Sequence, residues 1–272
     1  MVNIIFNASN YDRNSKKYKK QFSTNQTLHD MKVSLTSLSL YNSFFNVSAA
    51  NNNNVINIKF LGTTYSTTLE DGYYSVSDLN YAMQNLMIEN GLYIKSGTTN
   101  IFFIELVTNS VRYSIQLNSY LIPTNIEAGE LGYTKPENAT WIYPSSPKTP
   151  TFTFNTQFGL LIGYYQGTYP LIETINSSLL SKFSPQISVV NSLILTCNLV
   201  SNPGVTIPHD TFYSFGLSAA YGDQMKEKPY PIWNDIKNGT YQYIEISIYD
   251  QNLNSLEIYD TDGAIVLTIQ DK

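Results

Sequence analysis

Histidine and cysteine, the side chains that most often do chemistry near neutral pH, are scarce in this chain. It has one cysteine, Cys197, and two histidines, His29 and His209. Neither histidine has a second histidine or cysteine at a metal-ligand spacing such as H-x-x-x-H or C-x-x-C. The nucleophile elbow, the P-loop and the dinucleotide fingerprint are also missing from the sequence. We therefore predict no enzyme, no catalytic residue, no metal ligand and no cofactor, and we interpret both histidines as surface or turn residues.

Two carboxylate patterns come nearest to a site. The stretch 250–257 begins like a calcium loop, but Ser255 stands where such a loop needs a glycine at position six, and Thr261 stands where it needs a glutamate at position twelve. A polar turn explains it more simply, because Asp and Asn favour turns. Glu127 and Glu130 could serve as paired carboxylates of a glycosidase on a sandwich fold, but sequence spacing does not show a matched pair. A glycosidase stays open as an alternative that predicts turnover.

Basic side chains gather near the N-terminus. The first 22 residues contain five basic residues and one acidic residue, Asp12, although acidic residues outnumber basic ones by 21 to 16 in the whole chain. These basic residues are Arg13, Lys16, Lys17, Lys19 and Lys20. We predict that residues 1–30 form an N-terminal basic arm that contacts a neighbouring subunit or the phosphates of a nucleic acid. A solvated, frayed terminus is the alternative.

The elements that would carry these residues follow from hydrophobic periodicity. The longest two-residue alternation covers residues 187–199, with Cys197 on its apolar face as a small buried hydrophobe. Similar alternation predicts strands in the rest of the chain, at 31–44, 56–60, 63–69, 92–94, 101–107, 111–117, 152–154, 211–217, 244–248, 256–258 and 265–269. A change of parity predicts a bulge near Thr36 and Ser37.

One convincing helix interrupts the strands. Ser75 and Asp78 form a capping box, an apolar stripe follows, and Asn90-Gly91 ends the helix. We interpret the glycine-rich stretch 158–170 as turns or bulges. Many strands with one helix predict an all-β fold, a single jelly-roll β-sandwich with one short helix and long loops.

We expect residues 31–272 to form this jelly-roll domain, with a Pro-rich loop excursion near 133–150 that makes contacts at the surface. Charged residues are only 14% of the chain, so its polar face consists mainly of Asn, Ser and Thr. Such a surface suits a molecule packed against neighbours, and an AT-rich genome is the alternative explanation. No run of about 18 apolar residues occurs, so we expect no membrane span and a soluble, non-secreted chain.

Several segments, in this order, resemble a known family. They are 167–170 (Gly-Thr-Tyr-Pro), 197–200 (Cys-Asn-Leu-Val), 250–252 (Asp-Gln-Asn), Leu256, Ile258 and 265–267 (Ile-Val-Leu). This pattern is similar to that of the single-jelly-roll minor capsid proteins, the penton proteins, of virophages and related Polinton-type elements. The resemblance runs from about Met31 to the end and rests on hydrophobic and turn patterns.

The resemblance implies a structural role and no site residues. It implies a homopentamer at the fivefold vertices of an icosahedral viral capsid, in contact with the major capsid protein, within a virion assembled in the host cytoplasm. The basic arm would face neighbouring subunits or genomic DNA. A jelly-roll carbohydrate- or receptor-binding module, spike-like and using the 22 tyrosines as stacking platforms, is the alternative; it predicts a monomer or a trimer.

Overall fold

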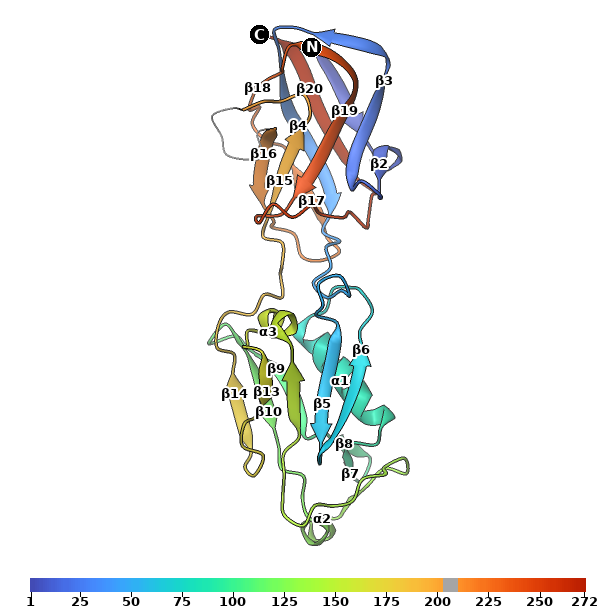
Figure 1. Ribbon diagram of the computed structural model, residues 1–272, viewed down its shortest axis with the longest axis vertical. Coiled ribbons are helices and arrows are strands. Elements are labelled where there is room, and N and C mark those ends of the chain that lie inside the picture. The colour runs from blue at the N-terminus through green and yellow to red at the C-terminus, as the bar shows by residue number, and fades with distance from the viewer. Residues whose placement is uncertain (203–209) are drawn as a thin grey trace. The chain divides into compact units, whose positions relative to one another are not determined.

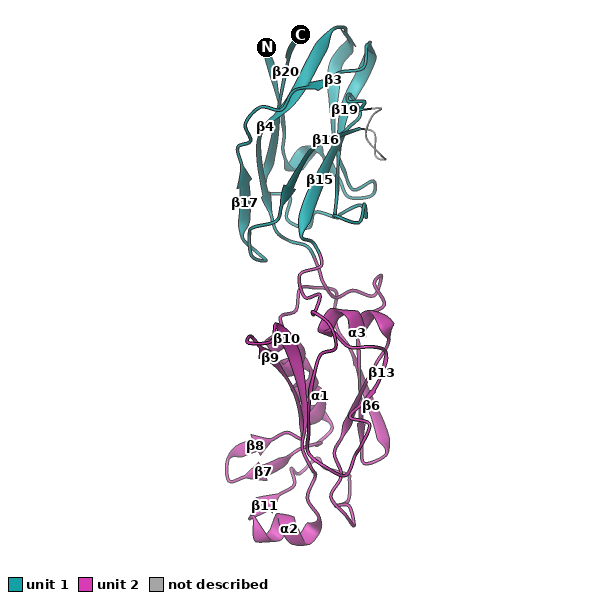
Figure 2. Ribbon diagram, turned by 90° about the vertical axis from the view of Figure 1, so that its left-hand side faces the viewer, with its two compact units in different colours: residues 1–44, 190–272 teal, residues 45–189 magenta. Residues whose placement is uncertain are grey.

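The computed structural model describes residues 1–202 and 210–272 (Figure 1). Strands hold 44% of the residues and helices 11%, so the predicted fold class, an all-β sandwich, is confirmed. The chain divides into two compact units (Figure 2): unit 1 is Met1–Phe44 with Val190–Lys272, and unit 2 is Phe45–Val189. The predicted single domain over 31–272 is therefore wrong, because alternating side chains show that strands exist and not which core they face.

The described residues of unit 1 form ten strands and a short 3-10 helix, η1. Their bounds are β1 (Val2–Phe6), η1 (Ala8–Asn10), β2 (Tyr11–Asp12), β3 (Lys17–Leu28), β4 (Met31–Tyr41), β15 (Ser192–Cys197), β16 (Thr211–Gly216), β17 (Gln224–Glu227), β18 (Asn234–Asp235), β19 (Gly239–Tyr249) and β20 (Ala264–Asp271). They form two antiparallel sheets, one in the order β1-β20-β4-β17 with β18 also paired to β4, the other in the order β16-β15-β19-β3-β2. These sheets are the two layers of a sandwich (Figure 1).

The inner faces of the two sheets form the core of unit 1. Ile244, Ile246 and Ile248 alternate inward along β19 as predicted, each at most 1% exposed. The predicted bulge in β4 is also confirmed, because its pairing with β20 jumps from Ser37 to Leu35 and leaves Thr36 as the extra residue.

The predicted strand over 187–199 is only half correct. β15 covers Ser192–Cys197, and its inward side chains are buried in unit 1. Ile187 instead packs against the core of unit 2. One alternating pattern therefore crosses the boundary at Val189, because alternation does not show where the chain passes from one core to another.

Residues 1–30 do not form an arm. β1 pairs with β20 from Val2 to Phe6, and β3 pairs with β19 from Lys17 to Leu28. Phe6, Tyr18 and Leu28 are buried in unit 1. The predicted boundary at residue 30 is therefore wrong. β3 lies next to the edge of its sheet, and its outward side chains are Lys, Gln and Thr, so its sequence resembles that of a solvated terminus.

Unit 2 contains three helices and ten strands. Their bounds are β5 (Val55–Phe60), β6 (Thr63–Thr68), α1 (Val76–Glu89), β7 (Ile94–Ser96), β8 (Thr99–Ile101), β9 (Ile104–Asn109), β10 (Ser114–Ser119), α2 (Asn125–Glu130), β11 (Tyr133–Thr134), β12 (Thr151–Phe154), α3 (Thr156–Ile162), β13 (Gly167–Tyr169) and β14 (Ser177–Leu180). The strands form three antiparallel sheets, β13-β12-β5-β6, β14-β10-β9 and β11-β7-β8.

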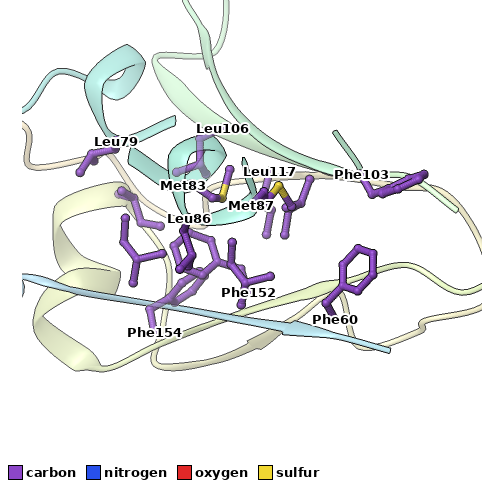
Figure 3. Packing of buried hydrophobic residues seen from close by; sticks show 14 of the residues in the cluster. Phe60, Leu79, Met83, Leu86, Met87, Phe103, Leu106, Leu117, Phe152 and Phe154 are labelled. Atoms are coloured by element: carbon purple, nitrogen blue, oxygen red, sulfur yellow. The ribbon is translucent and has the colours of Figure 1, made fainter. Parts of the chain in front are cut away.

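Helix α1 lies at the centre of the unit 2 core, as Figure 3 shows. The Ser75 capping box begins the helix, as predicted, and Asn90 caps its end. Its buried side chains are the predicted apolar stripe, Leu79, Met83, Leu86 and Met87. Met83 and Met87 lie beside Leu106 and Leu117 of the β9–β10 sheet, and Leu86 lies beside Phe152 of β12 (Figure 3).

Two helices and a core residue escaped the sequence prediction. α3 occupies part of the stretch interpreted as turns, and there Gly159 is required because a Cβ would lie 2.5 Å from the Tyr164 carbonyl oxygen. α2 begins with a capping box of Thr124 and Glu127. Trp141 of the Pro-rich stretch is only 7% exposed, and its Nε1 donates to the Gly91 carbonyl at 2.6 Å. That part of the predicted surface excursion belongs to the core.

Candidate contact surfaces

Of the side chains suited to catalysis, the structure describes Cys197 and His29. Burial raises the pKa of the Cys197 thiol to about 12, so the thiol is neutral and shielded. His29 is exposed, with Nδ1 2.9 Å from Asp30 Oδ2, and His209 lies outside the described residues. Over 1–202 and 210–272, no group of three or more His, Cys, Asp or Glu side chains could hold a metal ion.

The two carboxylate patterns are also accounted for locally. Asp250 Oδ1 accepts from the backbone N–H groups of Asn252 and Asn254, both at 2.8 Å, so the polar-turn interpretation is confirmed. Glu127 accepts from the Thr124 N–H in the capping box, and this bond lowers the pKa of its carboxyl. Glu130 ends the same short helix, so both glutamates lie on α2 and not on the strands of a sheet.

The five predicted contact residues lie on an ordered hairpin, residues 11–20, which we call the basic hairpin. Lys17 forms an ion pair with Glu245 at 2.6 Å, and this hydrogen bond raises the pKa of Lys17. The ammonium of Lys19 lies 3.9 Å from the centre of the Tyr243 ring. These two lysines therefore lie on the outer face of the sheet, where they contact side chains of β19.

The other three basic side chains point elsewhere. Arg13 donates to the Tyr259 carbonyl at 3.3 Å, and Lys16 lies in the turn with a positive φ of 55°. Lys20 donates to the Ile5 carbonyl of β1 at 2.8 Å. The structure brings Lys17 and Lys19 together and separates Lys20 from them, which sequence spacing alone did not show.

A groove opens in unit 1 between β1 and β3, with a volume of about 580 Å³; we call it the edge groove. Its lining residues are Val2, Asn3, Ile4, Ile5, Lys20, Gln21, Phe22, Gln26, Thr27, Leu28, Met31, Ile244 and Ile269. A bulge of several residues accompanies it, because β3 pairs with β19 at Gln21 and again at Gln26 while β19 advances only from Tyr243 to Tyr241. Sequence reasoning missed the groove, since residues 22–25 carry no signal for this bulge.

No family model matches the chain, and no curated protein matches it. Two solved structures match nearly the whole chain. The selenomethionine-labelled mavirus penton protein is 10% identical, with a TM-score of 0.43 over 98% of this chain and 97% of that one. A chain in the cryo-electron microscopy structure of the Sputnik virophage is 11% identical, with a TM-score of 0.34 over 97% of each chain.

Large apolar side chains stand in solvent on several loops. The most exposed are Val111 (94%), Tyr230 (91%), Leu171 (86%) and Ile142 (82%). The prolines on both sides of Tyr230 were the one available sequence signal for such a segment. Within the part of the chain that the structure describes, no helix is long and apolar enough to cross a membrane.

Proposed function

We propose that this chain is a minor capsid (penton) protein that forms homopentamers at the fivefold vertices of an icosahedral viral capsid. The observation that carries the proposal is the set of nearly fully exposed apolar side chains on ordered loops of both units. Where several such side chains gather, as at Leu171, Ile172 and Ile175, they form an apolar surface that neighbours in a shell would cover. This role is also the one implied by the sequence resemblance.

The loop 170–176 of unit 2 illustrates the point. It exposes Leu171 by 86%, Ile172 by 58% and Ile175 by 55%. The loop is held in place, because the Thr149 N–H donates to the Glu173 carbonyl at 2.7 Å and the Leu121 N–H donates to Asn176 Oδ1 at 2.8 Å. Covering one such side chain contributes about 1.5–3 kcal/mol, so a fixed loop with three of them favours a lasting contact.

A closed ring requires two different surfaces on each subunit. In a cyclic pentamer the contacts are heterologous, so one patch meets another patch of the next copy. The chain offers separate apolar surfaces at loop 170–176 and around Tyr230 and Ile232, which are 91% and 57% exposed. The proposal further includes contact with the major capsid protein, a place in the virion and assembly in the host cytoplasm.

The basic hairpin has a narrower role than a flexible arm would have. Lys17 is paired with Glu245, and Lys20 points toward β1 and away from Lys17 and Lys19. Arg13, Lys16 and Lys19 remain the residues best placed to meet an acidic neighbouring subunit or genomic DNA. Reversing Lys16 and Lys19 to glutamate should reduce assembly or nucleic-acid retention, and unchanged behaviour would remove the hairpin from the proposal.

Negative-stain microscopy of the purified chain tests the proposed function. We expect class averages of five-membered rings for the wild type and single particles for the Leu171→Ser/Ile172→Ser variant. Thr174→Ser in the same loop is the control and should still form rings. Threefold particles would contradict the penton role and favour a spike-like module.

The carbohydrate- or receptor-binding alternative gains no specific support. Four tyrosines are exposed by 65% or more: Tyr81, Tyr113, Tyr165 and Tyr230. They lie on helix α1, on the turn after β9, after α3 and after β17, so they come from four separate elements. A sugar-stacking platform would need such rings to converge on one ligand.

A further inference from the structure

The walls of the edge groove are the open edges of two strands. β1 is the last strand of its sheet, and β2 pairs only with Lys17 and Tyr18 of β3. Among residues 1–202 and 210–272 no other strand pairs with either open edge. Open edges with unpaired N–H and C=O groups are templates for an added strand.

One hydrogen bond shows which backbone groups of β1 point to the open edge. The Ile5 carbonyl accepts from Lys20 of β3 and so points away from β20. Backbone groups alternate in direction along a strand, so Asn3 also presents its N–H and C=O to the open edge. Val2 and Ile4, at the alternate positions, line the groove together with Ile269.

The lining is mostly apolar, with four uncharged polar residues and a single charged one. Its apolar side chains come from β1, β3, β4, β19 and β20, and Lys20 is the only charged side chain among them. A lysine ammonium has three N–H donors, and the Ile5 carbonyl takes one of them. The groove therefore complements a carboxylate placed among apolar groups. Its volume of about 580 Å³ lies within the usual range of binding pockets.

We propose that the edge groove docks an extended segment of a partner protein, which pairs with β1, inserts apolar side chains at alternate positions and places an Asp or Glu against Lys20. An added strand uses the backbone groups of Asn3 and Ile5, the apolar lining and the ammonium together. A fatty acid would use only the lining and the ammonium. The site is independent of the proposed capsid role.

A random dodecapeptide library, selected against the purified full chain, tests this site. We expect enriched peptides to have alternating apolar residues and an Asp or Glu. Lys20→Glu should shift the selection toward Lys and Arg. Lys19→Glu is the matched control, because Lys19 lies over Tyr243 on the other face of β3, and it should leave the selected sequences unchanged.

Two substitutions at one position test the strand pairing. Asn3→Pro removes the open-edge N–H and the side-chain bond from Thr268 but leaves the backbone hydrogen bonds to β20 in place, and we expect at least tenfold weaker binding of the best selected peptide. Asn3→Ala also loses the side-chain bond from Thr268 but keeps the N–H, and it should bind nearly as the wild type does. Circular dichroism verifies that all variants are folded.

Four results would overturn the proposal. The first is a library without enriched peptides, and the second is peptide binding that Lys20→Glu and Asn3→Pro leave unchanged. The third is tight, Lys20-dependent binding of lauric acid in place of peptide. The fourth is self-association of the chain that Asn3→Pro abolishes. The third would assign the groove to a lipid carboxylate, and the fourth would assign it to a second copy.

Discussion

Asn46 is the side chain whose removal tests our account of unit 2 most sharply. It is fully buried and joins two segments that lie far apart in the sequence. Its Nδ2 donates to the carbonyls of Tyr74 and Ile187, both at 2.9 Å, and its Oδ1 accepts from the Tyr74 N–H at 2.8 Å. It therefore fastens the exit of unit 2, at Ile187, to its entry.

The loss expected for Asn46→Ala follows from these three bonds. Each contributes about 1 kcal/mol net, and a buried partner left unsatisfied costs about 1–3 kcal/mol. We expect the free energy of unfolding of unit 2 to fall by about 3–5 kcal/mol. Asn54 is a matched control, because it is 8% exposed and makes one such bond, to the Leu69 carbonyl. Asn54→Ala should cost about 1 kcal/mol.

Tryptophan fluorescence makes the assay specific to one unit. The chain has two tryptophans, the buried Trp141 in unit 2 and Trp233 in unit 1. In a Trp233→Phe background, urea unfolding followed by fluorescence reports unit 2 alone. Equal losses for Asn46→Ala and Asn54→Ala would refute the reasoning that Asn46 fastens the two ends of the unit.

Three further predictions follow from burial and backbone geometry. Cys197 should not react with a thiol reagent in the native chain at pH 9, because burial raises its pKa, and should react fully in denaturant; rapid native labelling would show that β15 opens. Gly159→Ala should destabilise unit 2, because its Cβ would meet the Tyr164 carbonyl. Gly129→Ala in α2 places its Cβ in open space and should be neutral or stabilising by up to about 1 kcal/mol. Equal melting temperatures of the two variants would contradict this. Met83→Ala should cost unit 2 about 2–5 kcal/mol, measured with Trp141 as the reporter, and a loss below 1 kcal/mol would show that the cavity collapses.

Local features could be predicted from the sequence because their causes are local. The Ser75 capping box and the apolar stripe of α1 depend on spacing within a few turns, and both were predicted correctly. The alternation of Ile244, Ile246 and Ile248 and the bulge at Thr36 likewise follow from side-chain order along one strand.

Features that depend on distant partners could not be predicted. The passage of the chain between units at Val189 leaves no mark in a pattern that continues across it. Helix α3 was missed because Gly159 and Gly163 suggest turns, yet Gly159 is needed for a close approach of the Tyr164 carbonyl and Gly163 for the left-handed end of the helix.

The same limit applies to the contact surfaces. The five basic residues were found from composition, but their separation depends on Glu245, Tyr243 and Ile5, which lie on other strands. The edge groove depends on a bulge in β3 for which residues 22–25 carry no sequence signal. Which apolar loop residues are exposed follows from the packing of each unit.

The oligomeric mass of the purified full chain, measured by light scattering after gel filtration, tests the central proposal most directly. We expect a species of five times the 30.7 kDa chain mass. A stable species of three chains, or a single chain at every concentration measured, would contradict it.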